Sequence, residues 1–356
     1  MNPVVESARS VTRISEHVKL DRSGIERAAR QILDQLIREP YTPSSWAQVP
    51  LHPVPSLHSP EFILNWVFLV SSLNFSFWSA LPTDERFGVL YTTACDGKAE
   101  RPEEHCMWTG YFSLLAALWR AIERGVDVTN PAWYGTEATD EDLEAVFASD
   151  QAEPIPLLKE RIVVLRQVGS ILCQRYGGSV KTLIESCHHS ALDLVETVTS
   201  TFACYDDRTT YPPLSTPILI RKRAQILVAE TWAAFEGQDL GKFDDIDQLT
   251  MFADYRVPQI LHSLGTLEYD QHVTSILEQG TNLDNGSKEE VEIRCASIVV
   301  VEEIKHEIER LVTEQGVTVK VPNAVLLDFL LWDLAKVEEK QGRAVLPHHR
   351  TRSVFY

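Results

Sequence analysis

The sequence has a deficit of basic residues. Lys and Arg number 33 against 51 Asp and Glu, and the formal net charge is −18. Proteins that bind long nucleic acids normally carry a basic patch or stripe. The basic clusters here are short, at residues 221–223 and 348–352. Two short clusters suit one small anion better than a polymer, so we expect no direct binding to nucleic-acid polymers.

Cysteine is scarce as well. The chain has six cysteines and no CxxC pair. Disulfide frameworks belong mainly to short secreted chains, so we expect reduced thiols. Cys187 precedes His188 and His189 without the spaced partners of a tetrahedral metal site, and we interpret both histidines as helix-surface residues. A glycine-rich phosphate loop is also missing. We therefore expect no metal and no cofactor.

Long apolar runs are missing too. The most apolar early segment, residues 62–78, contains Asn65, Asn74 and several serines, which is typical of a buried core helix and not of a membrane span. The chain is charged early, at Glu6 and Arg9, and lacks the apolar region of a signal peptide. These absences predict a cytoplasmic protein without membrane contact.

Helical periodicity dominates what is present. Hydrophobic residues make up 44% of the chain, enough for a packed core. Apolar spacing predicts helices over residues 23–37, 60–73, 108–124, 139–149, 155–176, 179–202, 216–236, 258–265, 287–313 and 322–338. Residues 41–60 are expected to be extended, and residues 86–92 to form one arm of a small β-hairpin turning at 96–97. No repeat or linker divides the chain, so we expect one mostly α globular domain over residues 1–356.

The predicted helix 216–236 places a lysine among apolar residues. Lys222 lies on the same line as Ile226 and two alanines, while Arg223 and Glu230 occupy a different face that we expect to be wet. The stem of Lys222 can pack while its ammonium group reaches water. Alternatively it faces a cleft, where it pairs with an acid or holds a phosphate.

The predicted helix 322–338 is apolar nearly all round, so it should be buried. It nevertheless carries Asp328 and Asp333, and buried carboxylates need partners. One interpretation is a structural salt bridge, for example to Arg294 or Arg352. The other is that one carboxylate accepts hydrogen bonds from N–H groups of a heterocyclic ligand.

Aromatic residues accompany single polar groups at two places. Asn74 directly precedes Phe75 in LNFSFW, and Trp332 shares a helix face with Asp328. Aromatic walls with one amide would suit a flat heteroaromatic base, although aromatic stripes are usually core.

Asp254 lies among apolar and aromatic residues shortly before Pro258. At a helix N-terminus the free N–H groups would keep such a carboxylate ionised, so capping is the simplest explanation. Capping does not explain why Lys222 and Asp328 also lie on apolar surfaces. Several exceptions of this kind in one chain predict a shared polar cavity.

Short segments spread over nearly the whole chain are distinctive in combination. They are LNWVFL (64–69), LNFSFW (73–78), GYFSL (110–114), YGGS (176–179), KRAQILVAETW (222–232), TMFADYRVPQ (250–259), EVEIR (290–294), LLDFLLWD (326–333) and HRTRSVFY (349–356). In these segments the chain resembles the queuosine-salvage family, the queuosine 5'-phosphate N-glycosylase/hydrolases.

The resemblance implies a fold similar to helix-hairpin-helix DNA glycosylases and cleavage of the N-glycosidic bond of queuosine 5'-phosphate. The small-molecule partners would be this nucleotide and the released base queuine, which re-enters tRNA. The family's catalytic Asp matches Asp254, and a nearby Lys matches Lys222. Candidate substrate-binding positions are His52, Asn74, Phe75, Phe252, Asp328, Trp332, Asp333, His349 and Arg350. His348 stands where an aromatic residue is expected.

The implied chemistry agrees with a carboxylate in an apolar site. N-glycoside hydrolysis passes through an oxocarbenium-like ribosyl cation. Asp254 could stabilise that cation, attack it or orient water, and Lys222 could contact the 5'-phosphate or Asp254. Two other functions stay open: a non-catalytic protein that binds a nucleobase or nucleotide, and a DNA-glycosylase-like enzyme. The net charge of −18 argues against the second.

Overall fold

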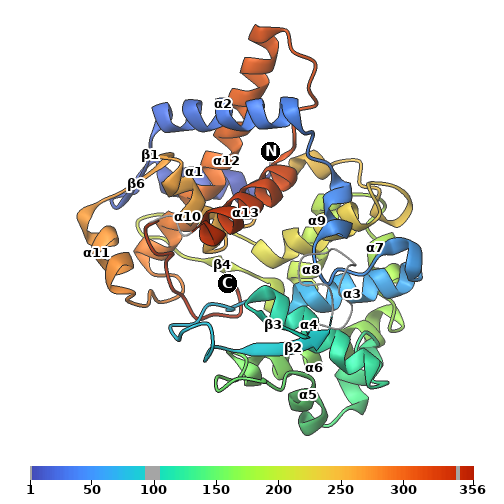
Figure 1. The fold of residues 1–356 in the computed structure, drawn as a ribbon. Helices are drawn as coiled ribbons and strands as arrows, with labels where there is room; N and C mark the ends of the chain where they lie inside the picture. The colour runs from blue at the N-terminus through green and yellow to red at the C-terminus, as the bar shows by residue number, and fades with distance from the viewer. Residues whose placement is uncertain (1, 93–104, 342–344) are drawn as a thin grey trace.

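The computed structural model describes residues 2–92, 105–341 and 345–356, which form a mostly helical protein (Figure 1). The helices are α1 (Pro3–Thr12), α2 (Arg22–Arg38), α3 (Pro60–Leu73), α4 (Tyr111–Glu123), α5 (Asp140–Val146), α6 (Leu158–Tyr176), α7 (Val180–Glu185), α8 (Ala191–Thr201), α9 (Lys222–Ala234), α10 (Arg256–Ser263), α11 (Gln271–Gln279), α12 (Lys288–Gln315) and α13 (Ala324–Lys340). Side-chain caps begin many of them, such as Asp21 at α2 and Asn323 at α13.

Strands in the described residues form three antiparallel pairs. β1 (Val18–Leu20) pairs with β6 (Leu267–Tyr269), β2 (Gly88–Thr92) with β3 (His105–Thr109), and β4 (Arg208–Thr209) with β5 (Ile218–Leu219). The pair β2–β3 confirms the predicted hairpin, whose expected turn at 96–97 lies outside the described residues. The β1–β6 and β4–β5 pairs were not predicted, because segments of two or three residues show no clear alternation.

Most predicted helices are confirmed, with three corrections. Residues 108 and 109 belong to β3, and α4 begins at Tyr111. The stretch 179–202 is two helices, α7 and α8, and His188 and His189 lie in the turn between them with φ of 50° and 66°. They are therefore not helix-surface residues. The stretch 41–60, expected to be extended, contains 3-10 turns at Pro43–Gln48 and Pro55–Leu57.

The third predicted helix that needs correction is α9, which starts later than expected. The predicted helix 216–236 begins only at Lys222, because residues Ile218–Leu219 form β5 and Arg221 takes a left-handed conformation with φ of 54°. The backbone N–H of Lys222 then donates to Asp207 Oδ2 at 3.2 Å. A tertiary partner therefore fixes the first turn of α9, which places Lys222 at a helix end instead of in mid-helix.

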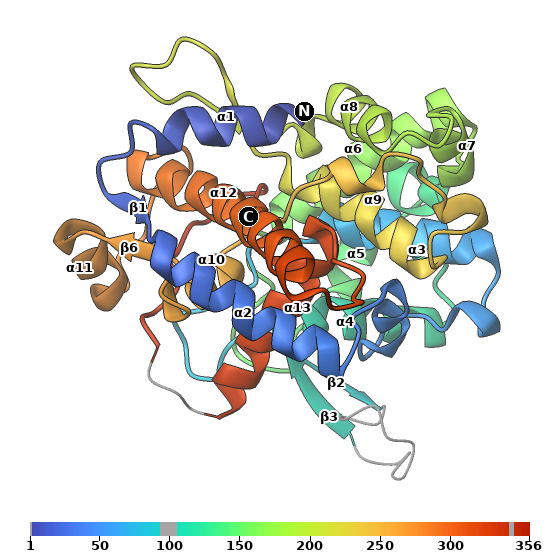
Figure 2. The same ribbon diagram turned by 90° about the horizontal axis from the view of Figure 1, so that it is seen from above.

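Two hydrophobic clusters make up the interior. One is built around α3, α4, α6, α8 and α9, and the other around α1, α2, α10 and α12. The arrangement of these helices can be followed in two views (Figure 1, Figure 2). Helix α13 belongs to both, with Val325 and Leu326 in the first cluster and Leu327 and Leu331 in the second. Residues of α13 between these two faces are thereby held at the boundary of the clusters.

Two further expectations are tested by the described residues. No helix among them is long and apolar enough to cross a membrane. Cys173, Cys187, Cys204 and Cys295 are free thiols, as expected. Cys106 is disulfide-bonded, so the expectation of reduced thiols throughout is wrong at this position.

Candidate active site

A cavity of about 370 Å³ lies where segments distant in sequence converge. Its walls come from residues 41–52, the loop after α3, the start of α4, helix α9, residues 252–256 and helix α13. Most of the candidate site residues lie on this wall, namely Asp254, Lys222, His52, Asn74, Phe252, Asp328, Trp332 and Asp333. The fold thus provides one polar cavity for side chains that the sequence had separated.

Lys222 is buried at the start of α9, with 4% of its surface exposed. Its Nζ donates to the carbonyl oxygen of Asn74 at 3.1 Å, which ties α9 to the end of α3. Burial lowers the pKa of Lys222 to about 8, while the negative charge of Asp254 acts in the opposite direction. The ammonium group therefore faces the cavity and not solvent. Of the two interpretations of Lys222 from the sequence, the structure supports the one in which it faces a cleft.

Asp254 both caps a helix and lines the cavity. Its Oδ1 accepts the N–H groups of Arg256 and Val257, each at 2.8 Å, so it stabilises the first turn of α10. None of the described residues donates a hydrogen bond to Oδ2. Burial raises the pKa of Asp254, and Lys222 and the two N–H groups oppose this shift by favouring the ionised form. One oxygen thus holds the helix and the other stays available to a ligand.

Asp328 and Asp333 have partners other than the expected arginines. Asp328 Oδ1 accepts the backbone N–H of Phe252 at 2.8 Å, and Asp333 Oδ2 accepts the hydroxyl of Tyr41 at 2.6 Å. Burial, followed by the charge of Asp254, raises the pKa of Asp328 well above its ordinary value. Burial also raises the pKa of Asp333. The predicted salt bridges to Arg294 and Arg352 are therefore wrong.

Glu230 is a cavity residue that the sequence analysis placed on a wet face. It is 8% exposed, and its carboxyl group makes no hydrogen bond or ion pair within the described part of the chain. Burial raises its pKa to about 8, against the opposite effect of Lys222. Helix α9 is covered on several sides, by α3, α8 and the turn Pro43–Gln48, so it has no wet face. Periodicity within α9 could not reveal this cover.

Arg223, expected on the same wet face, is also buried. Its guanidinium donates to the carbonyl oxygens of Ser72 and Cys204 and lies 5.0 Å from the ring centre of Phe75. Arg161 covers the same ring at 4.2 Å. Phe75 is therefore enclosed between two arginines and does not line the cavity, contrary to the prediction.

The tail residues His349 and Arg350 also lie outside the cavity wall. His349 is buried, and its Nε2 bonds to the hydroxyl of Tyr356 at 2.6 Å. Arg350 Nη1 donates to the carbonyl oxygen of Gly280 at 3.3 Å. Both have structural contacts here, whereas His348 and Tyr356 from the same tail reach the wall.

His52 holds an aromatic wall residue in place. Its Nδ1 bonds to the carbonyl oxygen of Trp46 at 2.9 Å, and its Nε2 to the hydroxyl of Tyr111 at 3.0 Å. Burial lowers the pKa of His52 to about 3, so the ring is neutral. Because a carbonyl only accepts, Nδ1 carries the proton and Nε2 accepts from Tyr111. The Tyr111 oxygen keeps its acceptor capacity toward the cavity.

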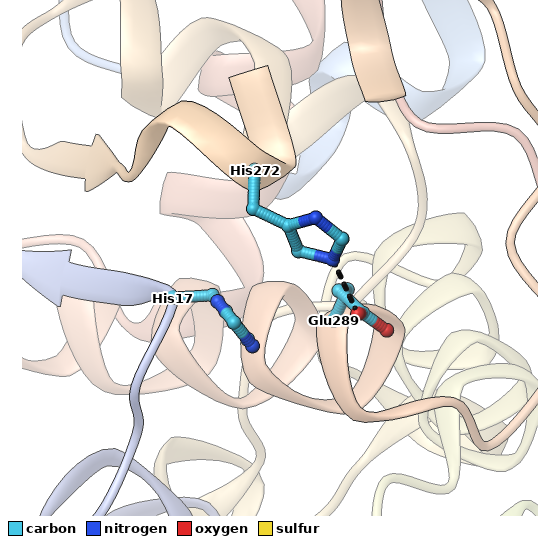
Figure 3. A group of neighbouring side chains, drawn as sticks. All are labelled: His17, His272 and Glu289. Carbon is cyan, nitrogen blue, oxygen red and sulfur yellow. Dashed lines mark hydrogen bonds and ion pairs between the residues drawn. The ribbon is translucent and has the colours of Figure 1, made fainter. Parts of the chain in front are cut away.

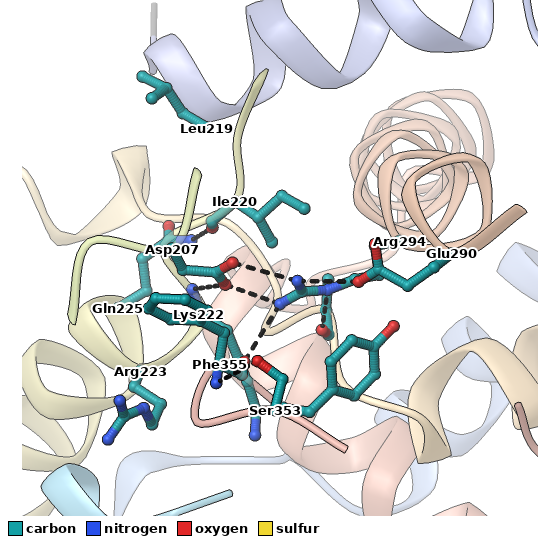
Figure 4. Close-up of polar contacts among 12 residues, drawn as sticks. Asp207, Leu219, Ile220, Lys222, Arg223, Gln225, Glu290, Arg294, Ser353 and Phe355 are labelled. Atoms are coloured by element: carbon teal, nitrogen blue, oxygen red, sulfur yellow. Dashed lines mark hydrogen bonds and ion pairs between the residues drawn. The ribbon is translucent and has the colours of Figure 1, made fainter. Parts of the chain in front are cut away.

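Arg294 connects the segments that carry the two central residues (Figure 4). Its two Nη groups donate to both oxygens of Asp207 at 3.1 and 2.7 Å, and Nη1 also donates to Glu290 at 3.2 Å. Its Nε donates to the carbonyl oxygen of Ala253 at 2.9 Å. Asp207 holds the N–H of Lys222, and Ala253 directly precedes Asp254. This buried network therefore sets the relative positions of Lys222 and Asp254.

Besides the buried Lys222, the cavity wall contains basic side chains in more exposed positions. They are Arg86, Arg256 and Lys336, all partly exposed. Arg256 pairs with Glu339 at 2.9 Å. Arg86 Nη2 donates to the carbonyl oxygen of Leu81 at 2.9 Å, and its guanidinium makes no ion pair with any described carboxylate. Spacing could not single these residues out, because they come from three segments far apart in the sequence.

The site has an acidic interior with one lysine and a more exposed basic part. Aromatic side chains complete the wall, including Trp332, whose ring lies 5.5 Å from Lys336 Nζ. These features define a mostly helical protein with a partly open cavity, lined by aromatic, acidic and basic side chains, of a size that suits a small molecule.

Comparison of the sequence with known protein families identifies the family of this chain. A model described as queuosine salvage protein matches residues 51–356. The chain therefore belongs to the queuosine salvage protein family.

Relatives from distant organisms match over their full length. A Mus musculus protein is 38% identical over 359 residues, covering 99% of this chain and 98% of the relative. A Schizosaccharomyces pombe protein is 37% identical over the whole of both chains. One from Sphaerobacter thermophilus is 35% identical, covering 99% of this chain and 97% of its own. Each is named queuosine 5'-phosphate N-glycosylase/hydrolase.

Proposed function

We propose that this protein hydrolyses the N-glycosidic bond of queuosine 5'-phosphate and releases queuine and ribose 5-phosphate. The observation that carries this proposal is Asp254, a carboxylate held by two backbone N–H groups with its second oxygen available to the cavity. The names of the full-length relatives support the same reaction.

Asp254 has the position and charge to serve the ribosyl cation. Positive charge develops on the sugar as the bond to the base breaks, and a fixed carboxylate stabilises it at little cost in reorganisation. Lys222 and the N–H groups of α10 favour the ionised form of Asp254 that this role needs. In our proposal Lys222 acts by holding Asp254 charged.

Glu230 supplies the acid that the leaving group requires. The base is a 7-deazaguanine, which lacks the N7 that ordinary purines use for protonation. With a pKa raised to about 8 by burial, Glu230 carries a proton at neutral pH. It donates that proton to the base as the bond from C1' breaks. Water then adds to C1', and its released proton restores the acid, so the cycle balances.

The two ends of the substrate match the two parts of the cavity. In its ionised form Asp328 has one oxygen on Phe252 N–H and a second for the N–H edge of the guanine-like base, whose N–H groups oppose the effect of burial on its pKa. The secondary amine of queuine is cationic and favours the acidic interior. The 5'-phosphate favours the basic part, with Arg86 as the main contact, because Arg256 and Lys336 pair with Glu339 whereas Arg86 has no ion pair among the described residues. Arg350 and Arg352, considered from the sequence, do not line the cavity.

The direct test is incubation of the purified protein with queuosine 5'-phosphate, followed by chromatography for queuine and ribose 5-phosphate. Release of both products by the wild type, with loss of release in Asp254→Asn, is the expected result. Binding of the nucleotide without turnover would support the alternative of a non-catalytic nucleobase carrier.

The remaining expectations belong to the same proposal. A fold similar to helix-hairpin-helix DNA glycosylases, a cytoplasmic location and the absence of direct polymer binding stay predictions. The net charge of −18 supports the last of them. A filter-binding assay with tRNA at low salt tests it, and tight binding there would contradict it.

A further inference from the structure

A cluster of histidine and carboxylate side chains lies apart from the cavity, where β1 meets α11 and α12 (Figure 3). His17, His272 and Glu289 each offer one ligand atom, and these atoms lie within 4.8 Å of one another. His272 Nε2 lies 2.8 Å from Glu289 Oε1, and the two imidazole rings have centres 5.0 Å apart. None of these residues lines the cavity, so the proposed hydrolysis does not use them.

The backbone under the cluster is held firmly. Glu292 accepts the N–H groups of Glu16, His17 and Val18, which fixes the turn that carries His17. β1 then pairs with β6. The side chains of Asp270 and Ser287 cap α11 and α12, which carry the other two residues. The three side chains are therefore presented by rigid elements.

Asp270 orients the first histidine. Its Oδ2 bonds to His17 Nδ1 at 2.8 Å, while its Oδ1 caps α11. This contact fixes the tautomer of His17 with the proton on Nδ1 and leaves Nε2 as a lone-pair donor. A carboxylate that holds the second nitrogen of an imidazole is the usual outer contact of a metal-binding histidine.

We propose that His17, His272 and Glu289 bind a divalent transition metal of the zinc class, with water as a fourth ligand. Two imidazoles and one carboxylate suit such an ion, whereas magnesium and calcium prefer oxygen ligands alone. Ligand atoms around a tetrahedral ion lie roughly 3.3–3.8 Å apart, so His272 and Glu289 must separate slightly while the more distant ligand atoms move closer together. The side chains of His17 and His272 are 20% and 52% exposed, which leaves them room to rotate.

The proposed role of this metal is structural: it would cross-link segments that are far apart in the sequence. A metal here would link residue 17 to the starts of α11 and α12, and it would stabilise the native state without taking part in hydrolysis. This site could not be predicted from the sequence, because the spacing of residues 17, 272 and 289 matches no metal motif.

The test is titration of metal-free, full-length protein with zinc chloride by calorimetry, together with thermal melts. We expect one ion per chain, a raised melting temperature, and no comparable effect of magnesium chloride. His272→Ala and Glu289→Gln should each weaken zinc binding by at least ~10-fold, which is the scale of losing one metal contact. His306→Ala, an exposed histidine on α12, is the matched control and should bind as the wild type does.

Cobalt gives a second measurement that does not depend on stability. Bound tetrahedrally, it should show visible absorption in the wild type and in His306→Ala, and lose it in His272→Ala. Absence of zinc binding, or equal binding by all variants, would overturn the proposal and leave two His–carboxylate pairs.

Discussion

Asp254 shows how one side chain can serve the fold and the proposed reaction together. Its Oδ1 accepts two N–H groups of α10, and the cavity receives Oδ2. The two interpretations offered by the sequence, capping and chemistry, are therefore compatible in geometry. An Asn replacement separates them, because its side-chain oxygen can still cap the helix without a charge.

The first prediction is that Asp254→Asn lowers the rate of queuine release at least ~100-fold, because removal of one key electrostatic group typically costs that much. Folding and queuine affinity should change little, since the cap is kept. Single-turnover chromatography and calorimetry on the same preparation measure both. If the folded variant releases queuine at a near-normal rate, Asp254 has no catalytic role and only caps α10.

The second prediction concerns Glu230 as the proton donor. Since its pKa is about 8, the wild-type rate should fall as pH rises through that value and the proton is lost. Glu230→Gln cannot donate a proton in this way, so its rate at pH 7 should be ~10²–10⁴-fold lower. Lys222 titrates in the same range, with a pKa of about 8. If the rate of Glu230→Gln still falls as pH rises through about 8, loss of the proton from Lys222 would explain the decrease instead.

Glu230 also makes stability depend on pH in a defined direction. Its pKa rises from 4.5 to about 8 on folding, so the fold favours the neutral acid. That contribution is fully present below pH 4.5 and is lost as pH rises through about 8. Glu230→Gln should therefore gain stability relative to the wild type by roughly 1.4 kcal/mol per pH unit between those values. Urea unfolding at pH 5, 6, 7 and 8 measures this trend.

The third prediction separates phosphate contacts from structural arginines. Arg86→Met should lower kcat/KM for queuosine 5'-phosphate by ~10- to 100-fold, because a charge-assisted hydrogen bond is lost. The nucleoside queuosine should be a poor substrate for both proteins and lose little further. Arg350→Met is the matched control, since Arg350 contacts Gly280 and lies outside the cavity wall. Equal losses on nucleotide and nucleoside would reject a phosphate role.

At the scale of elements, α9, α10 and α12 act as one unit through Arg294. This residue of α12 holds Asp207 and the carbonyl oxygen of Ala253, which adjoin the starts of α9 and α10. Lys222 and Asp254 stand at those starts. Their relative position therefore depends on a side chain that does not line the cavity.

The fourth prediction follows from this network. Arg294→Met leaves Asp207 and Glu290 as buried carboxylates without their cation, so the free energy of unfolding should fall by about 3–5 kcal/mol. The matched control is Arg9→Met, which removes a partly exposed pair with Glu303 and should cost less than about 1 kcal/mol. Urea unfolding gives both values. Equal losses in the two variants would contradict the special role of the buried network.

For the whole molecule, the position of the cavity links substrate binding to stability. Helix α13 contributes to both hydrophobic clusters, and Asp328, Trp332 and Asp333 of this helix line the cavity. A ligand that binds there contacts the boundary of the two clusters.

The fifth prediction is that queuine raises the melting temperature in a single transition. At a free concentration of 100 times Kd, binding to the native state adds about 2.7 kcal/mol. Differential scanning calorimetry with increasing queuine measures the shift. A shift confined to one of two resolved transitions would show that the clusters unfold separately and that the ligand holds only one.

The sequence alone determined the helical class, most helix positions, the β2–β3 hairpin and the candidates Asp254, Lys222 and Asp328. Helical spacing, capping residues and polar exceptions in apolar segments are local signals, and a chain carries them without reference to its partners. The family resemblance also rested on local segments, and the family is confirmed by a match over residues 51–356.

Only the tertiary structure decided which side chains meet. Glu230 is buried because α3, α8 and the turn Pro43–Gln48 cover α9. Phe75 lies outside the cavity wall, with the guanidinium groups of Arg161 and Arg223 against its ring. Burial and ion pairing depend on other segments of the chain, and periodicity within one helix carries no information about those segments.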